Sequence, residues 1–216
     1  MLEVKNVAIA TKRGPLLEAL SFAVGDGETL CVTGGEASGK SLLLRAIMGL
    51  YPLTAGHVSV DGELLTPLSA CVFRRLMAFV PQDAPLASGT VEAMLRLPFA
   101  LEANRSVPFS KRGVLDQWQQ LGLDESLYAR PLSDTTPRER MLALLSVAGI
   151  MRKGIVLVDD IATALDTDGE ALVADYLRRL AQGGASVLAV TRSDSFAQLL
   201  DRQVALPTTV AADNDQ

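Results

Sequence analysis

The chain has 216 residues, of which 49% are hydrophobic and 5% aromatic, and its formal net charge at pH 7 is −5. A chain of this length can still form one hydrophobic core, so we expect a single α/β domain built mainly on aliphatic side chains. The acidic balance, with basic residues only in short pairs, argues against a nucleic-acid-binding face.

Neither cysteine usage nor hydropathy indicates secretion or a membrane span. Cys31 and Cys71 lack the spacing of a metal site, and Cys31 lies in an apolar run. Met1 is not followed by an apolar signal segment, and no run approaches the roughly 18 apolar residues that a spanning helix needs. We therefore expect a reduced, cytoplasmic protein whose membrane role would come through a partner.

The first third of the chain has the pattern of short strands. Residues 2–9, 20–24 and 29–33 are strand-like runs, and Gly25-Asp26-Gly27 is a turn before the last of them. A helix is expected over residues 41–50 from the spacing of its apolar positions. Asp61-Gly62 then joins residues 57–60 to 63–65 as a predicted hairpin. We expect a small antiparallel β subdomain that leads into a buried strand.

The rest of the chain alternates helices with short apolar strands. Residues 77–80 are one such strand, and about 87–151 are predicted to form an inserted helical lobe. Within it, Thr136-Pro137-Arg138-Glu139 has the form of a capping box that opens a helix to about Met151. The remaining predictions are strands at 155–158 and 186–190, helices at 171–181 and 196–200, and a disordered tail at 207–216.

A glycine-rich loop carries the clearest chemical signal. It matches G-x-x-x-x-G-K-[ST], follows a predicted strand and opens a predicted helix, which is the context that distinguishes a phosphate-binding loop from a simple glycine turn. Such a loop turns backbone amides inward, and the helix dipole favours the same anion. Lys40 would bind the β- and γ-phosphates, and Ser41 would contact Mg²⁺. The residues are Gly34, Gly35, Glu36, Ala37, Ser38, Gly39, Lys40 and Ser41.

Two acidic residues follow the apolar strand at 155–158. Asp159 is the expected carboxylate on the metal side, because a magnesium-nucleotide site needs one at the end of a neighbouring strand. Asp160 stands where a base could polarise an attacking water. Acidic residues after a strand are also common as helix caps or loop residues. The presence of the glycine-rich loop at residues 34–41 is what favours a catalytic role for Asp160.

The order of these motifs resembles the ATP-binding subunit of ABC transporters over residues 1–206. Phe79-Val80-Pro81-Gln82-Asp83 is similar to the family's glutamine loop, and Thr163-Ala164-Leu165-Asp166 to its dimer-facing D-loop. By this resemblance Gln82 would contact Mg²⁺ and the lytic water and couple the site to a membrane subunit. The implied fold is a P-loop NTPase with a RecA-like core, an N-terminal antiparallel β subdomain and an inserted helical subdomain.

The resemblance also implies partners. Family members work as head-to-tail dimers in which each ATP lies between the glycine loop of one subunit and an LSGGQ signature of the other. Closure on ATP and reopening after hydrolysis drive a transmembrane permease. We therefore expect an integral membrane permease subunit, a second ATP-binding domain, identical or related, and a peripheral location on the inner face of the cell membrane.

This sequence departs from the family at several positions. Leu132-Ser133-Asp134-Thr135-Thr136-Pro137 replaces the signature in an ambiguous register. Asp160 stands where the family has glutamate, and Arg192 where it has a switch histidine; Arg192 either clamps the γ-phosphate or is a solvated surface arginine. Near Thr11 the family's adenine-stacking aromatic is absent, and Glu36 and Ala37 are unusual within the loop.

Three functions are compatible with this sequence. The first is an ABC transporter subunit that binds Mg²⁺-ATP and hydrolyses it slowly or only with its partners. The second is a regulatory or structural subunit that closes on ATP without hydrolysis, as the altered Asp160, Arg192 and signature would allow. The third, a P-loop kinase of small metabolites, would need a substrate pocket and lid arginines. Arg138 and Arg140 could serve as these, but their place after a predicted helix cap favours the solvated face of that helix.

Overall fold

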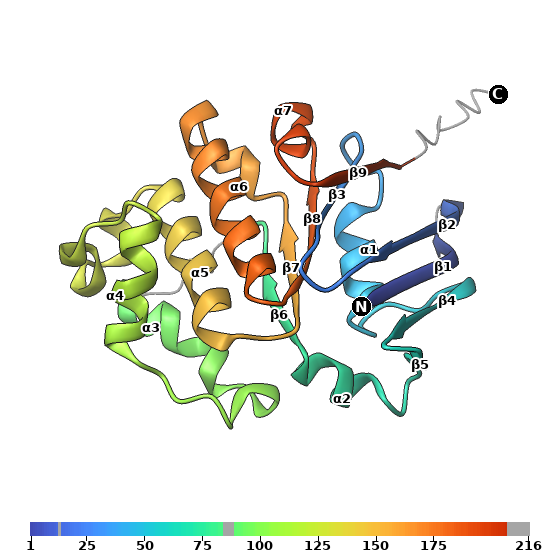
Figure 1. The fold of residues 1–216 in the computed structure, drawn as a ribbon, viewed down its shortest axis with the longest axis horizontal. Helices are drawn as coiled ribbons and strands as arrows, with labels where there is room; N and C mark the ends of the chain where they lie inside the picture. Colours follow the sequence, from blue (N-terminus) through green and yellow to red (C-terminus); the bar gives the residue numbers. More distant parts are fainter. Residues whose placement is uncertain (13, 84–88, 207–216) are drawn as a thin grey trace.

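The computed structural model describes residues 1–12, 14–83 and 89–206, and these residues form two sheets with helices beside them (Figure 1). The expected disordered tail at 207–216 and the expected start of the helical lobe at 87 lie outside the described residues. In Figure 1 the antiparallel sheet lies at the right, the second sheet in the middle and helices α3, α4 and α5 at the left. This confirms the predicted α/β class.

The antiparallel sheet has the order β2-β1-β4-β5. Its strands are β1 (Leu2–Thr11), β2 (Gly14–Val24), β4 (Ala55–Val60) and β5 (Glu63–Leu64). β2 begins six residues before the predicted strand, because its first half pairs with the end of β1. The predicted hairpin turn is confirmed: Asp61 and Gly62 have φ of 51° and 84°, the two positive values that a type I′ turn requires.

The second sheet is parallel throughout and has the order β6-β7-β8-β3-β9. Its strands are β3 (Thr29–Thr33), β6 (Met77–Val80), β7 (Ile155–Asp159), β8 (Ser186–Thr191) and β9 (Arg202–Ala205). Every residue of β7 and β8 is buried, as the continuous apolar runs predicted. Because the strands are parallel, the loops that follow β3, β6, β7 and β8 meet at one edge of the sheet.

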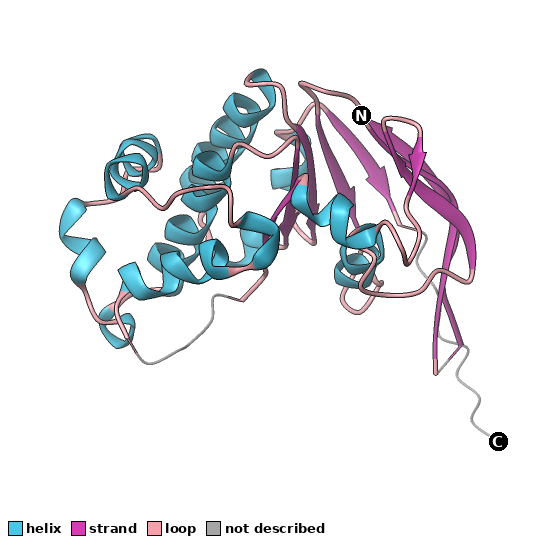
Figure 2. Cartoon of the chain, turned by 90° about the horizontal axis from the view of Figure 1, so that it is seen from below, coloured by secondary structure: helices cyan, strands magenta, loops and turns pink. Residues whose placement is uncertain are grey.

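Helices connect these strands and cover the parallel sheet. They are α1 (Lys40–Ile47), α2 (Ala70–Arg75), α3 (Val91–Arg96), α4 (Lys111–Gln120), α5 (Pro137–Met151), α6 (Thr167–Gln182) and α7 (Asp194–Gln198). Short 3₁₀ turns lie at η1 (Leu97–Ala100), η2 (Glu102–Asn104), η3 (Glu125–Ala129), η4 (Leu132–Asp134) and η5 (Ile161–Ala164). Viewed from below, the helices of residues 89–151 stand apart from the antiparallel sheet, with the parallel sheet between them (Figure 2). The exact bounds of the helical lobe stay a prediction.

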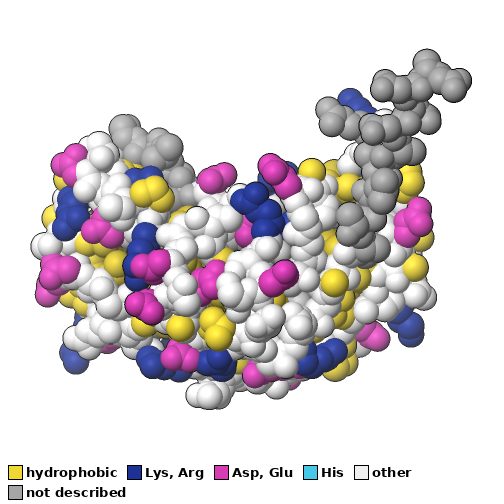
Figure 3. Space-filling model, turned by 90° about the horizontal axis from the view of Figure 1, so that it is seen from above, with side chains coloured by type: hydrophobic (Ala, Val, Ile, Leu, Met, Phe, Trp, Pro, Cys, Tyr) yellow, Lys and Arg dark blue, Asp and Glu magenta, His cyan; other side chains and the backbone are white. Residues whose placement is uncertain are grey.

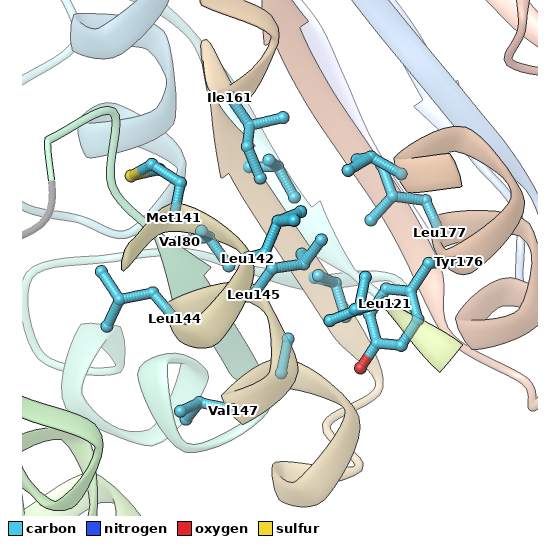
Figure 4. Packing of buried hydrophobic residues seen from close by; sticks show 14 of the residues in the cluster. Val80, Leu121, Met141, Leu142, Leu144, Leu145, Val147, Ile161, Tyr176 and Leu177 are labelled. Carbon is cyan, nitrogen blue, oxygen red and sulfur yellow. The ribbon is translucent and has the colours of Figure 1, made fainter. Parts of the chain in front are cut away.

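Two hydrophobic clusters pack on opposite faces of the parallel sheet, and β7 contributes alternate residues to each. Val156 and Val158 belong to the cluster with α3 to α6, whereas Ile155 and Leu157 belong to the cluster with α1 and the antiparallel sheet. Figure 4 shows side chains of α5 directed to both sides, and residues 141–148 of this helix are all buried. No helix within the described ranges is both long and apolar enough to cross a membrane.

Candidate functional site

Most of the expected site residues line one cavity at the edge where the parallel strands end, and Gly34, Gly35 and Asp159 lie beside it in hydrogen-bond contact with Lys40 or Ser41. This cavity has a volume of about 440 Å³ and is lined by Thr11, Leu16, Glu36, Ala37, Ser38, Gly39, Lys40, Ser41, Leu42, Gln82, Asp160 and Arg192. Lining residues come from the loops that follow β3, β6, β7 and β8, so the cavity brings together four loops.

Over the described residues, the face of the molecule shown in Figure 3 carries no block of one charge. This view from above has acidic and basic side chains interspersed over the face.

The glycine loop leaves the start of α1 open. Gly39 is the N-cap of α1 at φ 94°, and no side chain caps the helix there. A Cβ at Gly39 would lie 2.8 Å from Leu16 Cδ2, and one at Gly34 would lie 2.6 Å from Ser38 Oγ. The positive φ favours glycine at Gly39, and at both positions a side chain would have to displace a neighbouring side-chain atom. Because the first-turn amides of α1 have no side-chain cap, they remain available to an anion.

Lys40 places its charge inside this loop. Its Nζ donates hydrogen bonds to Gly34 O at 2.7 Å, Gly35 O at 2.6 Å and Ser38 Oγ at 3.3 Å. The residue is only 7% exposed, and this burial lowers the pKa of the ammonium, while the Asp160 carboxylate acts in the opposite direction. These hydrogen bonds hold the glycine loop around the Lys40 ammonium, whose positive charge would attract an anionic ligand.

Ser41 and Asp159 form a pair of oxygen donors beside the loop. Ser41 Oγ donates to Asp159 Oδ1 at 2.9 Å. Burial raises the pKa of Asp159, and the hydrogen bond from Ser41 opposes that rise. Hydroxyl and carboxylate oxygens suit Mg²⁺, which is commonly held by one or two carboxylates together with substrate phosphates. Among the described residues no three His, Cys, Asp or Glu side chains form a metal cluster, so an ion here would need ligand oxygens as well.

Asp160 is buried, and both of its carboxylate oxygens accept hydrogen bonds from the segment after β8. Arg192 Nε donates to Asp160 Oδ2 at 2.9 Å, while Arg192 N and Thr191 Oγ1 donate to Oδ1 at 3.2 and 3.3 Å. Asp160 is 3% exposed and has φ 43°, in the left-handed region. The sequence placed both Asp160 and Arg192 at the site but did not predict this ion pair. The pairing of β7 with β8, which sets Asp159 beside Val190, creates it.

Gln82 reaches the same cavity from another strand. It follows β6, which pairs with β7 through Val80 and Val158, so its loop lies beside the loop that carries Asp159 and Asp160. Gln82 is half-buried, and the residues that come soon after it, 84–88, are outside the described part of the chain. The structure thus brings Gln82 to the glycine loop, while its expected part in metal and water binding stays a prediction.

The signature-like segment closes on itself at the start of α5. Thr136 is the N-cap: its side chain accepts from Glu139 N at 3.1 Å, and Glu139 Oε2 accepts from Thr136 N at 2.7 Å. Pro137, the first helical residue, has no N–H to donate. This confirms the predicted capping box and places the start of α5 at Pro137. Little donor capacity remains at this helix end for a phosphate.

The two arginines of α5 that a kinase lid would need are occupied at the same helix end. Arg138 Nη1 donates to both carboxylate oxygens of Asp166 at 3.2 Å. Arg140 Nη1 donates to Thr135 O at 2.6 Å. Neither Arg138 nor Arg140 lines the cavity of the glycine loop. They stabilise the start of α5 and its contact with the N-cap of α6.

Comparisons with known proteins agree on one family. The family model described as ABC transporter matches residues 17–164. The ABC transporter ATP-binding protein RamB of Streptomyces coelicolor is 32% identical over 212 residues, which are 95% of this chain and 34% of that protein. The energy-coupling factor transporter ATP-binding protein EcfA1 of Levilactobacillus brevis is 30% identical over 197 residues, 88% of this chain and 68% of that protein.

Solved structures show the same fold. A dimeric ATP-binding cassette in a post-hydrolysis state, bound to ADP and Pi, aligns with a TM-score of 0.82 at 23% identity, over 95% of this chain and 94% of that one. Several relatives are much longer than this chain, which spans only 14%, 23% and 34% of the first three curated proteins that it matches. The match therefore covers only a part of those proteins.

Proposed function

Because this chain belongs to the ABC transporter family and has the fold of its ATPase domains, we propose that it binds Mg²⁺-ATP over the glycine loop and drives a membrane permease by ATP-dependent dimer closure. Hydrolysis is proposed to be slow or dependent on the partners. ATP binding is supported by membership of the family.

The observation that carries the proposal is the open start of α1 around Lys40. The uncapped amides after Gly39 and the ammonium of Lys40 would bind the phosphates, and Ser41 and Asp159 would hold Mg²⁺. The ion would supply positive charge that offsets the charge of the phosphates. Thr11 and Leu16 border the same cavity where the nucleoside would lie.

Slow hydrolysis follows from the state of Asp160. A general base must accept a proton from the attacking water, but both oxygens of Asp160 already accept hydrogen bonds, and one comes from the guanidinium of Arg192. The guanidinium of Arg192 thus lies on a carboxylate oxygen that an attacking water would have to approach. The same contact supports the second candidate, a subunit that closes on ATP without hydrolysing it.

The permease is proposed to contact an apolar groove beside the glutamine-loop segment. A cavity of about 480 Å³ lies between β6, α3, η1 and α5, and the three residues before Gln82 line part of its wall. Its rim exposes Leu50, Phe79, Leu97 and Leu101. An exposed apolar groove of this kind is typical of a protein contact site. It would also hold the chain at the inner face of the membrane.

The second ATP-binding domain is proposed to be a related subunit rather than an identical copy. In a symmetric dimer the start of α5 would face a nucleotide phosphate, but its donors are satisfied by Thr136 and Glu139. The carboxylate of Asp134 would add repulsion there. A partner domain with a glycine-containing signature would complete the site over this chain's glycine loop.

Calorimetry of the purified chain with Mg²⁺-ATP tests nucleotide binding. We expect saturable heat with the parent chain and none with Lys40→Ala at the same concentrations, because the mutation removes the cation at the centre of the loop. Ser41→Ala should keep ATP binding but lose its dependence on Mg²⁺. Absence of heat from both ATP and ADP at millimolar ligand, or a Lys40→Ala variant that behaves like the parent, contradicts the proposal.

Single-turnover phosphate release separates the slow enzyme from the pure binder. With enzyme in excess over ATP, we expect slow release that Asp160→Asn reduces by about a hundredfold, the usual contribution of a general base. Arg192→His, which restores the family residue, should raise the rate. Complete absence of release would favour the non-hydrolysing subunit. Hydrolysis of many ATP molecules per second by the chain alone would contradict the prediction that hydrolysis is slow.

A further inference from the structure

Glu170 is a buried carboxylate outside the expected site. It lies in the first turn of α6 and is only 8% exposed. Its Oε1 accepts from Ser193 Oγ at 2.6 Å and its Oε2 from Ser195 Oγ at 2.7 Å. Burial of a carboxylate is unfavourable unless hydrogen bonds satisfy it. The two serine hydroxyls therefore hold Glu170, and Glu170 in turn holds the start of α7.

The hydrogen bonds continue from Ser193 to the catalytic candidate. Ser193 Oγ accepts from Phe196 N at 3.2 Å as the cap of α7, and Ser193 N donates to Thr191 Oγ1 at 3.0 Å. Thr191 Oγ1 is 3.3 Å from Asp160 Oδ1, to which it donates. Residues 191–193 are thus fixed between two buried carboxylates, one on α6 and the other after β7.

The position of Arg192 depends on this segment. Its backbone N–H and its Nε both donate to Asp160, so a shift of the backbone at 191–193 would move both donors together. On the other side, Glu170 N donates to Asp166 O at 2.8 Å, and Asp166, the N-cap of α6, is the last residue of the segment that resembles the dimer-facing loop. Displacement of the first turn of α6 would therefore act on Arg192 through Glu170.

We propose that Glu170 is a positioning residue that keeps Arg192 on Asp160 by holding Ser193 and Ser195. It couples the first turn of α6 to the release of the Asp160 carboxylate. This role rests on the proposed restraint of Asp160 by Arg192, and it extends that restraint to a residue that does not touch nucleotide. Loss of the Glu170 contacts frees residues 191–193 and raises the hydrolysis rate of bound ATP.

A double-mutant cycle on the full chain tests the role. Single-turnover phosphate release at saturating Mg²⁺-ATP is measured for the parent, Glu170→Ala, Arg192→Ala and the double variant. We expect Glu170→Ala to raise the rate about fivefold, within the usual range of coupling between residues in one network, and to change nothing once Arg192 is absent. Glu170→Gln keeps a hydrogen-bond acceptor and the side-chain volume, so its rate of phosphate release should be close to that of the parent.

Two controls separate positioning from general loosening. Asp168→Ala removes an exposed carboxylate from the same turn of α6 and should leave the rate at the parent value. Ser195→Ala removes one hydroxyl from Glu170 without removing the cap of α7, so it should raise the rate even if Glu170→Ala fails to fold. Circular dichroism and thermal unfolding establish that each variant is folded.

The outcomes that overturn the proposal are distinct from those that remove the Arg192 restraint. Equal effects of Glu170→Ala with and without Arg192 would mean that Glu170 acts elsewhere. A rate that rises with Arg192→Ala but not with Glu170→Ala or Ser195→Ala would overturn the role of Glu170 alone. An unchanged rate in Arg192→Ala would show that the contact of Arg192 with Asp160 does not slow hydrolysis. The proposed role of Glu170 would then also be wrong.

Discussion

Helices α1 and α5 begin at the two places where the family resemblance puts a phosphate, and they begin in opposite ways. α1 follows the glycine loop, and its N-cap, Gly39, offers no side chain to the first-turn amides. α5 follows the signature-like segment, and its N-cap, Thr136, forms a complete capping box with Glu139. Pro137 removes one more donor at that end.

The difference shows that a helix N-terminus binds anions only when its amides lack partners within the chain. A capping box stabilises a helix by satisfying these donors, and for the same reason it removes them from a ligand. At α1 the loop before the helix is held by hydrogen bonds from Lys40 to the carbonyl oxygens of Gly34 and Gly35. These bonds do not involve the first-turn amides of the helix. Of these two helix starts, α1 therefore keeps more of its first-turn amides without a side-chain partner.

The largest effect is expected from a side chain at the open helix start. Gly39→Ala adds a Cβ at 2.8 Å from Leu16 Cδ2 in a backbone with φ 94°, so the free energy of unfolding should fall by about 2 kcal/mol. The affinity for ATP should fall about tenfold or more, since the loop must shift to relieve the contact. Urea unfolding and calorimetry measure the two effects.

Gly62→Ala is the matched control for Gly39→Ala. Gly62 has a similar φ of 84°, but no atom lies within 4 Å of its added Cβ, and it belongs to the hairpin turn. It should lose stability through the backbone alone and keep full ATP affinity. A loss of ATP affinity in this control equal to that of Gly39→Ala would contradict the local explanation.

An intermediate effect is expected at the closed start of α5. The hydrogen bond from the Thr136 backbone holds the pKa of Glu139 below its usual 4.5, with Arg130 contributing. The stabilisation is therefore present above pH 4.5 and is lost as the pH falls through the lower value of the folded protein. Glu139→Gln should lower the free energy of unfolding by about 1 kcal/mol at pH 7 and by progressively less in acid.

Denaturant unfolding at a series of pH values between neutrality and acid measures this difference. Glu63→Gln, at an exposed position of β5, is the control and should show little difference from the parent at any pH. ATP affinity of the isolated chain should be unchanged in Glu139→Gln. A stability difference that stays constant down to strongly acidic pH would show that charge is not what closes α5.

The smallest effect is expected within the glycine loop. Ala37 has φ 56°, a region that costs an alanine about 1–2 kcal/mol. Glycine removes this strain but loses more backbone entropy on folding, so Ala37→Gly should stabilise the chain by only about 0.5 kcal/mol. Ala19→Gly, at φ 53° in β2, should show the same gain without any change in ATP affinity. A clear loss of stability in Ala37→Gly would contradict this account.

Local features of the chain were predictable because their contacts lie within a few residues. The glycine loop, the turn at Asp61-Gly62 and the capping box at Thr136 depend on backbone geometry and on bonds between residues at most six apart. The apolar runs of β7 and β8 likewise predicted buried parallel strands. In these cases the residue types and their spacing determine the backbone geometry, the short-range hydrogen bonds or the burial of the segment.

Elements that depend on distant pairing were missed or misjudged. β9 has only four residues, mostly exposed, and forms a strand by pairing with β3. α2 is a six-residue helix that carries two arginines and was not predicted. β2 extends back to Gly14 because β1 offers it a partner there. None of these segments has a periodic pattern long enough to define it alone.

The sequence by itself determined the fold family, the glycine loop and the residues that gather at it. Only the tertiary structure decided how those residues are paired. Arg192 contacts Asp160 across 32 positions, and Ser193 contacts Glu170 across 23. The parallel alignment of β7 with β8 and the packing of α6 against α7 create these contacts. Such contacts depend on where whole elements lie, and no local spacing in a single sequence records that.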